Sequence, residues 1–187
     1  MKRCRKWFSI LLAAALALSL LTACSGAAAL PVFPGTVSLS TLEPLNGGWP
    51  WNNIAPEDQF GNDYSSAVNY AVFNWNNRYD YWQGSENGYD VGYAEYRVYG
   101  RYDLITMTLA PYKTIREEGK SFVQVYADGK LVATSPVITR KSDPVSLEAS
   151  IAGAEYIKIM VYNYIGGHIG DKNDSAFILS NARLWRG

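Results

Sequence analysis

The sequence has 187 residues, 48% of them hydrophobic and 14% aromatic, and its 17 Lys and Arg balance 17 Asp and Glu. This length accommodates one domain with a sizeable core. Because four of the basic residues lie within the first six positions, the remainder of the chain is net acidic, which argues against a nucleic-acid partner.

Residues 1–23 have the layout of a lipoprotein signal peptide. A basic start precedes the apolar run 8–21, which is shorter than the roughly 20 residues that a membrane span needs. The run ends in Leu21-Thr22-Ala23-Cys24, a lipobox pattern. We predict cleavage before Cys24, diacylation of its thiol, and a lipid-anchored location on the extracytoplasmic face of the cell membrane. The alternative is an ordinary secretory signal that is cleaved near 27–29.

A short tether is predicted to follow the signal, over residues 24–37. Most of it is small, apolar and Pro-containing, without helical periodicity. One domain, residues 38–187, accounts for the rest. Because Cys4 lies in the signal and Cys24 takes the lipid, that domain has no thiol to pair. Its stability then depends on packing or on a bound ion.

From residue 38 onward, apolar residues alternate with polar ones at period two, and Gly, Pro, Asn and Asp interrupt the pattern at short intervals. Asp128-Gly129, between two such segments, is the strongest hairpin signal. The predicted strands are 68–73, 94–99, 105–109, 122–126, 131–133, 145–151 and 156–161. Several short antiparallel strands, each with one apolar face, predict an all-β antiparallel sandwich.

Five motifs in order over residues 58–187 resemble a known family. They are Asp58-Gln59-Phe60-Gly61-Asn62-Asp63-Tyr64, the segment 94–102, Val125-Tyr126-Ala127-Asp128-Gly129-Lys130, the segment 151–159, and Asp174-Ser175-Ala176 with Ala182-Arg183-Leu184. Together they are similar to NPCBM domains, β-sandwich modules found beside family 98 glycoside hydrolases. Where many members carry a Trp after the closing Asp-x-Ala, this chain has Phe177 and Ile178.

The resemblance implies a jelly-roll sandwich, frequently with a structural calcium ion, that in some members binds galactose-containing glycans. We expect such an ion here, with Asp58, Asp63 and Asp174 as candidate ligands, because calcium prefers hard oxygen ligands and the domain lacks disulfides. An unchanged melting temperature in excess chelator would remove this expectation.

The residues offer their own indication of sugar binding in segment 74–83. Sugar rings stack on aromatic side chains, and their hydroxyls need planar donors and acceptors. We predict Trp82 or Tyr81 as the stacking platform; the predicted hydrogen-bonding groups are Asn77, Arg78, Asp80 and Gln83. The segment 49–53 is the next choice. The alternative is that Trp75 and Trp82 belong to the core and that the Asn and Asp residues form turns.

Catalysis is not expected. His168 is the only histidine, so histidine clusters are excluded, and no nucleophile-elbow pattern appears. The sequence therefore predicts a non-catalytic, membrane-anchored carbohydrate-binding module whose partner is a glycan. The alternative is an envelope scaffold lipoprotein that binds other envelope proteins and no sugar.

Overall fold

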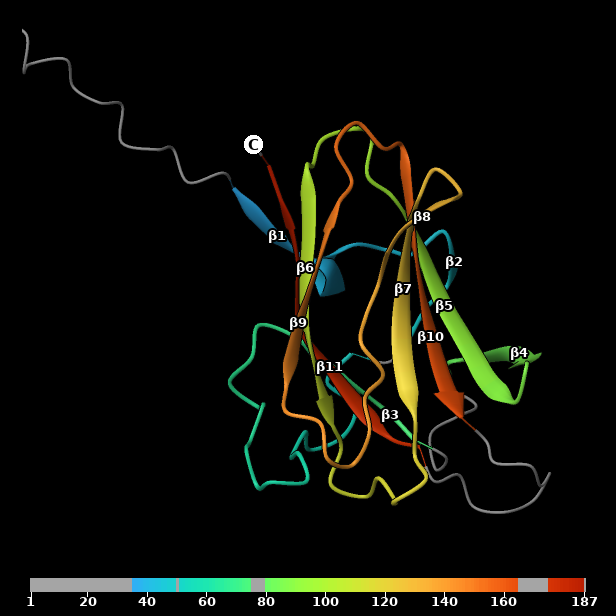
Figure 1. Ribbon diagram of the computed structural model, residues 1–187. Helices are drawn as coiled ribbons and strands as arrows, with labels where there is room; N and C mark the ends of the chain where they lie inside the picture. The colour runs from blue at the N-terminus through green and yellow to red at the C-terminus, as the bar shows by residue number, and fades with distance from the viewer. Residues whose placement is uncertain (1–34, 50, 75–79, 165–174, 187) are drawn as a thin grey trace, which may run out of the picture. The chain divides into compact units, whose positions relative to one another are not determined.

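The computed structural model describes residues 35–49, 51–74, 80–164 and 175–186, and nearly every regular element in them is a β-strand (Figure 1). Residues 35–187 form one compact unit. The elements are β1 (Thr36–Ser38), the 3₁₀ turn η1 (Leu39–Thr41), β2 (Asn46–Gly47), β3 (Tyr70–Phe73), β4 (Trp82–Glu86), β5 (Tyr89–Arg97), β6 (Leu104–Pro111), β7 (Ser121–Ala127), β8 (Lys130–Thr134), β9 (Val145–Ser150), β10 (Tyr156–Tyr164) and β11 (Phe177–Trp185).

The strands form two antiparallel sheets that face each other. Sheet A has the order β1-β11-β6-β9, with β3 also paired to β11, and sheet B has the order β2-β5-β10-β7-β8, with β4 also paired to β5. Figure 1 shows the two sheets as the left and right layers of the sandwich. The predicted all-β antiparallel sandwich is confirmed.

The core lies between the sheets and follows from the alternation of the strands. Ile105 and Leu109 of β6 point inward, as do Val125 of β7 and Ile159 of β10, and all four are buried. The aromatic position after the closing motif is also filled, because Phe177 stacks on Phe73 with ring centroids 4.8 Å apart. Phe177 therefore occupies the core despite the absence of the family's usual Trp.

The Asp128-Gly129 hairpin between β7 and β8 is present as predicted. Both residues have positive φ, 47° and 79°, as a tight two-residue hairpin requires. The Asp128 carboxylate also accepts hydrogen bonds from the backbone of Glu155 and Tyr156, 2.9 Å away in the latter case. The turn thus also fixes the start of β10.

Asn69 joins β1 and β3 along one edge of β11. Its Nδ2 donates to the Ser38 hydroxyl at 2.7 Å and to the Ala182 carbonyl at 2.8 Å, and its Oδ1 accepts from the Ala182 amide at 2.8 Å. Asn181, with φ 52°, makes the irregular turn in β11 at this point. Between β1 and β3, the buried side-chain amide of Asn69 thus makes the hydrogen bonds to β11 that a strand backbone would otherwise make.

The structure corrects one predicted boundary. Residues 36 and 37 were assigned to the tether, but they belong to β1, where Thr36 pairs with Trp185 and Val37 with Leu184. Val37 is partly buried against the core, which explains why this segment joins sheet A. The described part of the chain contains no helix with the length and hydropathy of a membrane span.

Candidate functional site

Two asparagines close the free edge of β3. Asn52 Oδ1 accepts a hydrogen bond from the backbone of Tyr70 at 3.3 Å, and Asn53 Oδ1 accepts one from the backbone of Val72 at 3.3 Å. The backbone N–H of Asn52 also donates to the Tyr70 carbonyl at 2.7 Å. Asn52 has φ 57°, a left-handed conformation that Asn tolerates better than most residues. The two side chains therefore take the place of a neighbouring strand.

The following loop, residues 54–66, is organised around the buried Asp58. Its Oδ1 accepts from the backbone of Phe60 and Asn62, both at 2.9 Å, and its Oδ2 accepts from the Asn62 side chain and the Tyr64 hydroxyl. Burial raises the pKa of Asp58, but the hydrogen bonds from Asn62, Phe60 and Tyr64 outweigh it and hold the pKa below its ordinary value. Asp58 is therefore an ionised residue that shapes the loop.

The loop packs on the outer face of sheet A through a second, smaller apolar cluster. Buried Val72, Tyr112 and Ile178 form its centre, and Ile54 and Tyr70 pack against it. Outside the cluster, Glu57 forms an ion pair with Lys113 at 2.9 Å. The loop is thus fixed both to the sheet and to the residues that follow β6.

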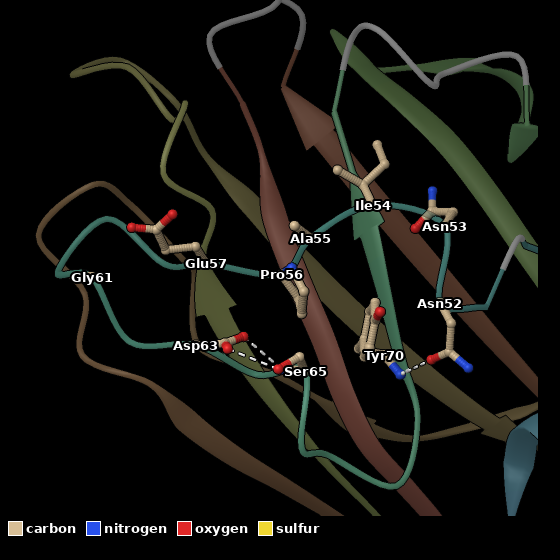
Figure 2. Close-up of a pocket in the computed structure, with 10 residues that line it drawn as sticks. All are labelled: Asn52, Asn53, Ile54, Ala55, Pro56, Glu57, Gly61, Asp63, Ser65 and Tyr70. Carbon is tan, nitrogen blue, oxygen red and sulfur yellow. Dashed lines mark hydrogen bonds between the residues drawn. The ribbon is translucent and has the colours of Figure 1, made fainter.

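These contacts leave a pocket of about 600 Å³ between the loop and the edge of β3, named pocket 52–70 below. Its lining consists of Asn52, Asn53, Ile54, Ala55, Pro56, Glu57, Gly61, Asp63, Ser65 and Tyr70. Figure 2 shows Pro56 and Tyr70 at the middle, the two asparagines on one side, and Glu57 and Asp63 on the other. The pocket is large enough for a small ligand.

The chemistry of pocket 52–70 suits a neutral polyol. Tyr70 and Pro56 offer an apolar surface, amides lie on one side, and carboxylates lie on the other. Hydrogen bonds from the amide and the hydroxyl of Ser65 keep the pKa of Asp63 below its ordinary value, so this carboxylate is an acceptor at neutral pH. The Asn53 Nδ2 is buried and has no hydrogen-bond partner in the described residues, so an acceptor on a ligand would satisfy it.

Tyr81 does not have the exposed ring that a stacking platform requires. The side chain is 1% exposed, and its ring packs edge-on against Phe73 with centroids 5.0 Å apart. Its hydroxyl accepts a hydrogen bond from Asn163 at 2.9 Å. Tyr81 is buried because its backbone lies very close to β5 at Gly92. A Cβ added to Gly92 would lie 2.5 Å from the backbone carbonyl oxygen of Tyr81, so only glycine permits this approach. Tyr81 is therefore a core residue, which corrects the prediction.

Trp82 is exposed, unlike Tyr81. It begins β4, is 39% exposed, and its Nε1 donates to the Ser85 hydroxyl at 3.4 Å. Asp80 and Gln83 beside it are also exposed. Trp75, Asn77 and Arg78 lie outside the described residues. The structure thus presents Trp82 with two of its four predicted polar partners, but it does not place these residues in the lining of pocket 52–70.

The two predicted calcium ligands that the structure describes, Asp58 and Asp63, both make hydrogen bonds within their own loop. Asp58 directs both carboxylate oxygens into its own loop, Asp63 is bonded to Ser65, and Asp174 lies outside the described residues. In the part of the chain that the structure describes, no three Asp, Glu, His or Cys side chains are arranged to hold a metal ion. Bound calcium stays a prediction, to be tested by a thermal melt in excess chelator.

Sequence reasoning found part of pocket 52–70 and missed part of it. The second-choice segment 49–53 supplies Asn52 and Asn53, although Trp49 in that segment is buried against Phe73. Glu57 and Tyr70 were not predicted. The available signal was the NPCBM-like entry motif 58–64, in which we predicted two metal ligands and which also shapes the loop beside the pocket.

The sandwich of two antiparallel sheets has the same fold as solved carbohydrate-binding modules. Residues 92–182 match the family model of the NPCBM/NEW2 domain, which confirms the resemblance that the sequence motifs predict. No curated protein matches the sequence.

Solved structures with the same fold come from Clostridium perfringens. The CBM51-2 and INT domains of ZmpB, in complex with GlcNAc, match with a TM-score of 0.56 and 14% identity over 82% of this chain and 32% of that chain. CBM51 from the GH95 protein, in complex with methyl-galactose, matches with a TM-score of 0.51 and 18% identity over 80% of this chain and 99% of that chain. The chain thus spans about a third of the ZmpB fragment and nearly all of the single CBM51 module.

Proposed function

We propose that this chain is a non-catalytic carbohydrate-binding protein and that pocket 52–70 holds its glycan. The observation that supports the proposal is the arrangement of the pocket, in which the apolar surface of Tyr70 and Pro56 lies between amides and carboxylates. A pyranose has the same arrangement, with an apolar ring face and hydroxyls around the rim. Binding of GlcNAc and methyl-galactose by modules of the same fold adds support.

The proposal includes a membrane anchor. The lipobox at Cys24 supports anchoring through a diacylglycerol, and the predicted signal supports a location on the extracytoplasmic face of the cell membrane. A module held there binds glycans of the wall or of a host surface. Because hydroxyl desolvation offsets much of the stacking and hydrogen-bond energy, we expect a dissociation constant on the order of 0.1 to 1 mM.

The experiment is a broad glycan array, with and without calcium, followed by titration of the best short glycan. Glu57→Ala and Asn52→Gly remove polar groups from opposite sides of the pocket and should each weaken binding about tenfold, equivalent to roughly 1.4 kcal/mol. Gly accepts the positive φ of residue 52, and loss of an exposed ion pair such as Glu57–Lys113 has little effect on stability.

Glu117→Ala is the matched control, because Glu117 forms a comparable exposed ion pair with Lys141 at 2.7 Å outside the pocket. This variant should bind like the wild type. Trp82→Ala tests the rival site at the start of β4. A folded Trp82→Ala protein that no longer binds, together with unchanged binding by both pocket variants, would move the site to β4.

A further inference from the structure

The outer face of sheet B carries a concentration of aromatic side chains. Strand alternation turns Ala94, Val125 and Ile159 toward the core, so the residues next to them point outward. Of the aromatic residues at outward positions, Tyr156 is exposed, Tyr162 is buried, and the other five are half-buried: Tyr89, Tyr93, Phe122, Tyr126 and Tyr164. Because the solvent-facing side of an antiparallel sheet is normally polar, this composition indicates a binding surface.

Part of this face is a preassembled aromatic floor. The rings of Phe122 and Tyr162 stack with centroids 4.4 Å apart and planes at 7°, and Tyr89 packs edge-on against Phe122 at 5.3 Å. Tyr164 packs edge-on against Tyr89 at 5.4 Å. These contacts fix the rings before any ligand arrives, which lowers the entropy cost of binding.

Beside this floor, toward the start of β10, the face contains a groove of about 250 Å³. It is lined by Glu95, Tyr126, Gly129, Tyr156, Ile157, Lys158 and Met160. Tyr156 is 37% exposed, and the hydroxyls of Tyr126 and Tyr162 both donate to Gln124 Oε1, at 2.8 and 3.1 Å. The groove is smaller than the ~300–1,000 Å³ pockets of drug-sized ligands, so it suits one ring of a longer chain.

The charges beside the groove occur as neighbouring cations and anions. Lys158 lies opposite Glu95 in the β5–β10 register, and its Nζ is 4.1 Å from the centroid of the Tyr93 ring. Arg97 forms an ion pair with Glu155 at 2.7 Å. Since Lys158 and Arg97 beside the groove each have a glutamate at a neighbouring position, the groove favours an uncharged ligand over a polyanion.

We propose that the outer face of sheet B is a second glycan-binding surface that takes a linear, uncharged polysaccharide. One sugar ring occupies the groove beside Tyr126 and Tyr156, and the chain continues along β10 over Tyr93 and the aromatic floor. Alternate residues of a strand are about 6.8 Å apart, so successive outward rings offer repeated stacking positions. The surface is separate from pocket 52–70, which shares no lining residue with the groove.

The test is affinity electrophoresis of the full-length protein, in non-ionic detergent, through native gels that contain galactan, galactomannan, xyloglucan or mixed-linkage β-glucan. The wild type should be retarded by at least one of these neutral polymers. The double variant Tyr126→Ala/Tyr156→Ala should bind that polymer about tenfold more weakly, because two stacking rings are lost. The single variant Tyr156→Ala, at an exposed position, gives an intermediate loss and is the variant to use if the double variant does not fold.

Phe60→Ala removes an exposed aromatic ring outside the groove and should leave retardation unchanged. The Glu57→Ala protein should bind short glycans on the array more weakly, while the neutral polymer should still retard it in the gel. This result would distinguish the outer face of sheet B from pocket 52–70. Retardation of a folded double variant equal to that of the wild type overturns the inference. Absence of retardation of the wild type by every neutral polymer, or retardation only by a polyanion such as polygalacturonate, also overturns it.

Discussion

At the scale of single residues, Asp58 shows how one carboxylate organises a loop. We expect Asp58→Asn to lower the free energy of unfolding by about 2 kcal/mol at pH 7, because hydrogen bonds to an ionised acceptor are replaced by weaker ones and the Asn amide cannot accept at both ends. The measurement is urea denaturation of both proteins.

The effect should depend on pH in a defined direction. A carboxyl whose pKa is lowered by folding stabilises the native state above its ordinary pKa of 3.8, and this stabilisation is lost as the pH falls through the lower, folded-state value. The difference between wild type and Asp58→Asn should therefore narrow below about pH 4. A difference that stays constant from pH 7 to pH 3 would show that folding does not lower the pKa of Asp58.

The sequence indicated which residue types could bind a sugar more reliably than it indicated which side chains are exposed. Aromatic and amide side chains marked segment 74–83, yet Tyr81 is buried while its neighbour Trp82 is exposed. The difference depends on the close approach of Tyr81 to Gly92, a contact between strands that periodicity around residue 81 does not contain. The role of Asp58 in shaping its loop was also not predicted. Its hydrogen-bond partners define a turn, and a turn has no repeating pattern in the sequence.

At the scale of elements, Asn69 connects two short strands to β11. We expect Asn69→Ala to lower the free energy of unfolding by about 3 kcal/mol, because the change leaves the Ala182 amide and carbonyl buried without their partner. Asn69→Asp retains the acceptor for the Ala182 amide and loses the donors to Ser38 and the Ala182 carbonyl. Comparing the two variants therefore separates the contribution of the acceptor from that of the donors. A loss below about 1 kcal/mol in urea for Asn69→Ala would show that water or backbone movement replaces the side chain.

Four long strands were predicted, whereas the two shortest strands and the nine-residue β11 were not among the predicted strands. Segments 94–99, 105–109, 145–151 and 156–161 alternate because each places one face on the core, and they correspond to β5, β6, β9 and β10. β1 and β2 span three and two residues, too few for a period to be recognised. They exist because the edges of β11 and β5 provide ladder partners, a property of the folded sheet.

At the scale of the whole molecule, the proposed lipid anchor of the chain can be tested directly. Cys24→Ser removes the thiol that a diacylglycerol requires, so the variant should move from the membrane pellet to the soluble fraction, while wild-type protein stays in the pellet. Mass spectrometry of the wild-type N-terminus is the control for lipidation. Freely soluble wild-type protein with an N-terminus at Ala27 or later would refute the anchor.

The position of β1 has a mechanical consequence. β1 pairs with one end of β11 at Trp185, whereas β3, which borders pocket 52–70, pairs with the other end at Phe177. Tension between an N-terminal anchor and a glycan held in the pocket would therefore run along β11 and load β1 lengthwise. Because ladder hydrogen bonds lie across the strands, such a pull shears the bonds of β1 together instead of unzipping them one after another. The three residues of β1 would thus bear the load when flow pulls on a tethered glycan.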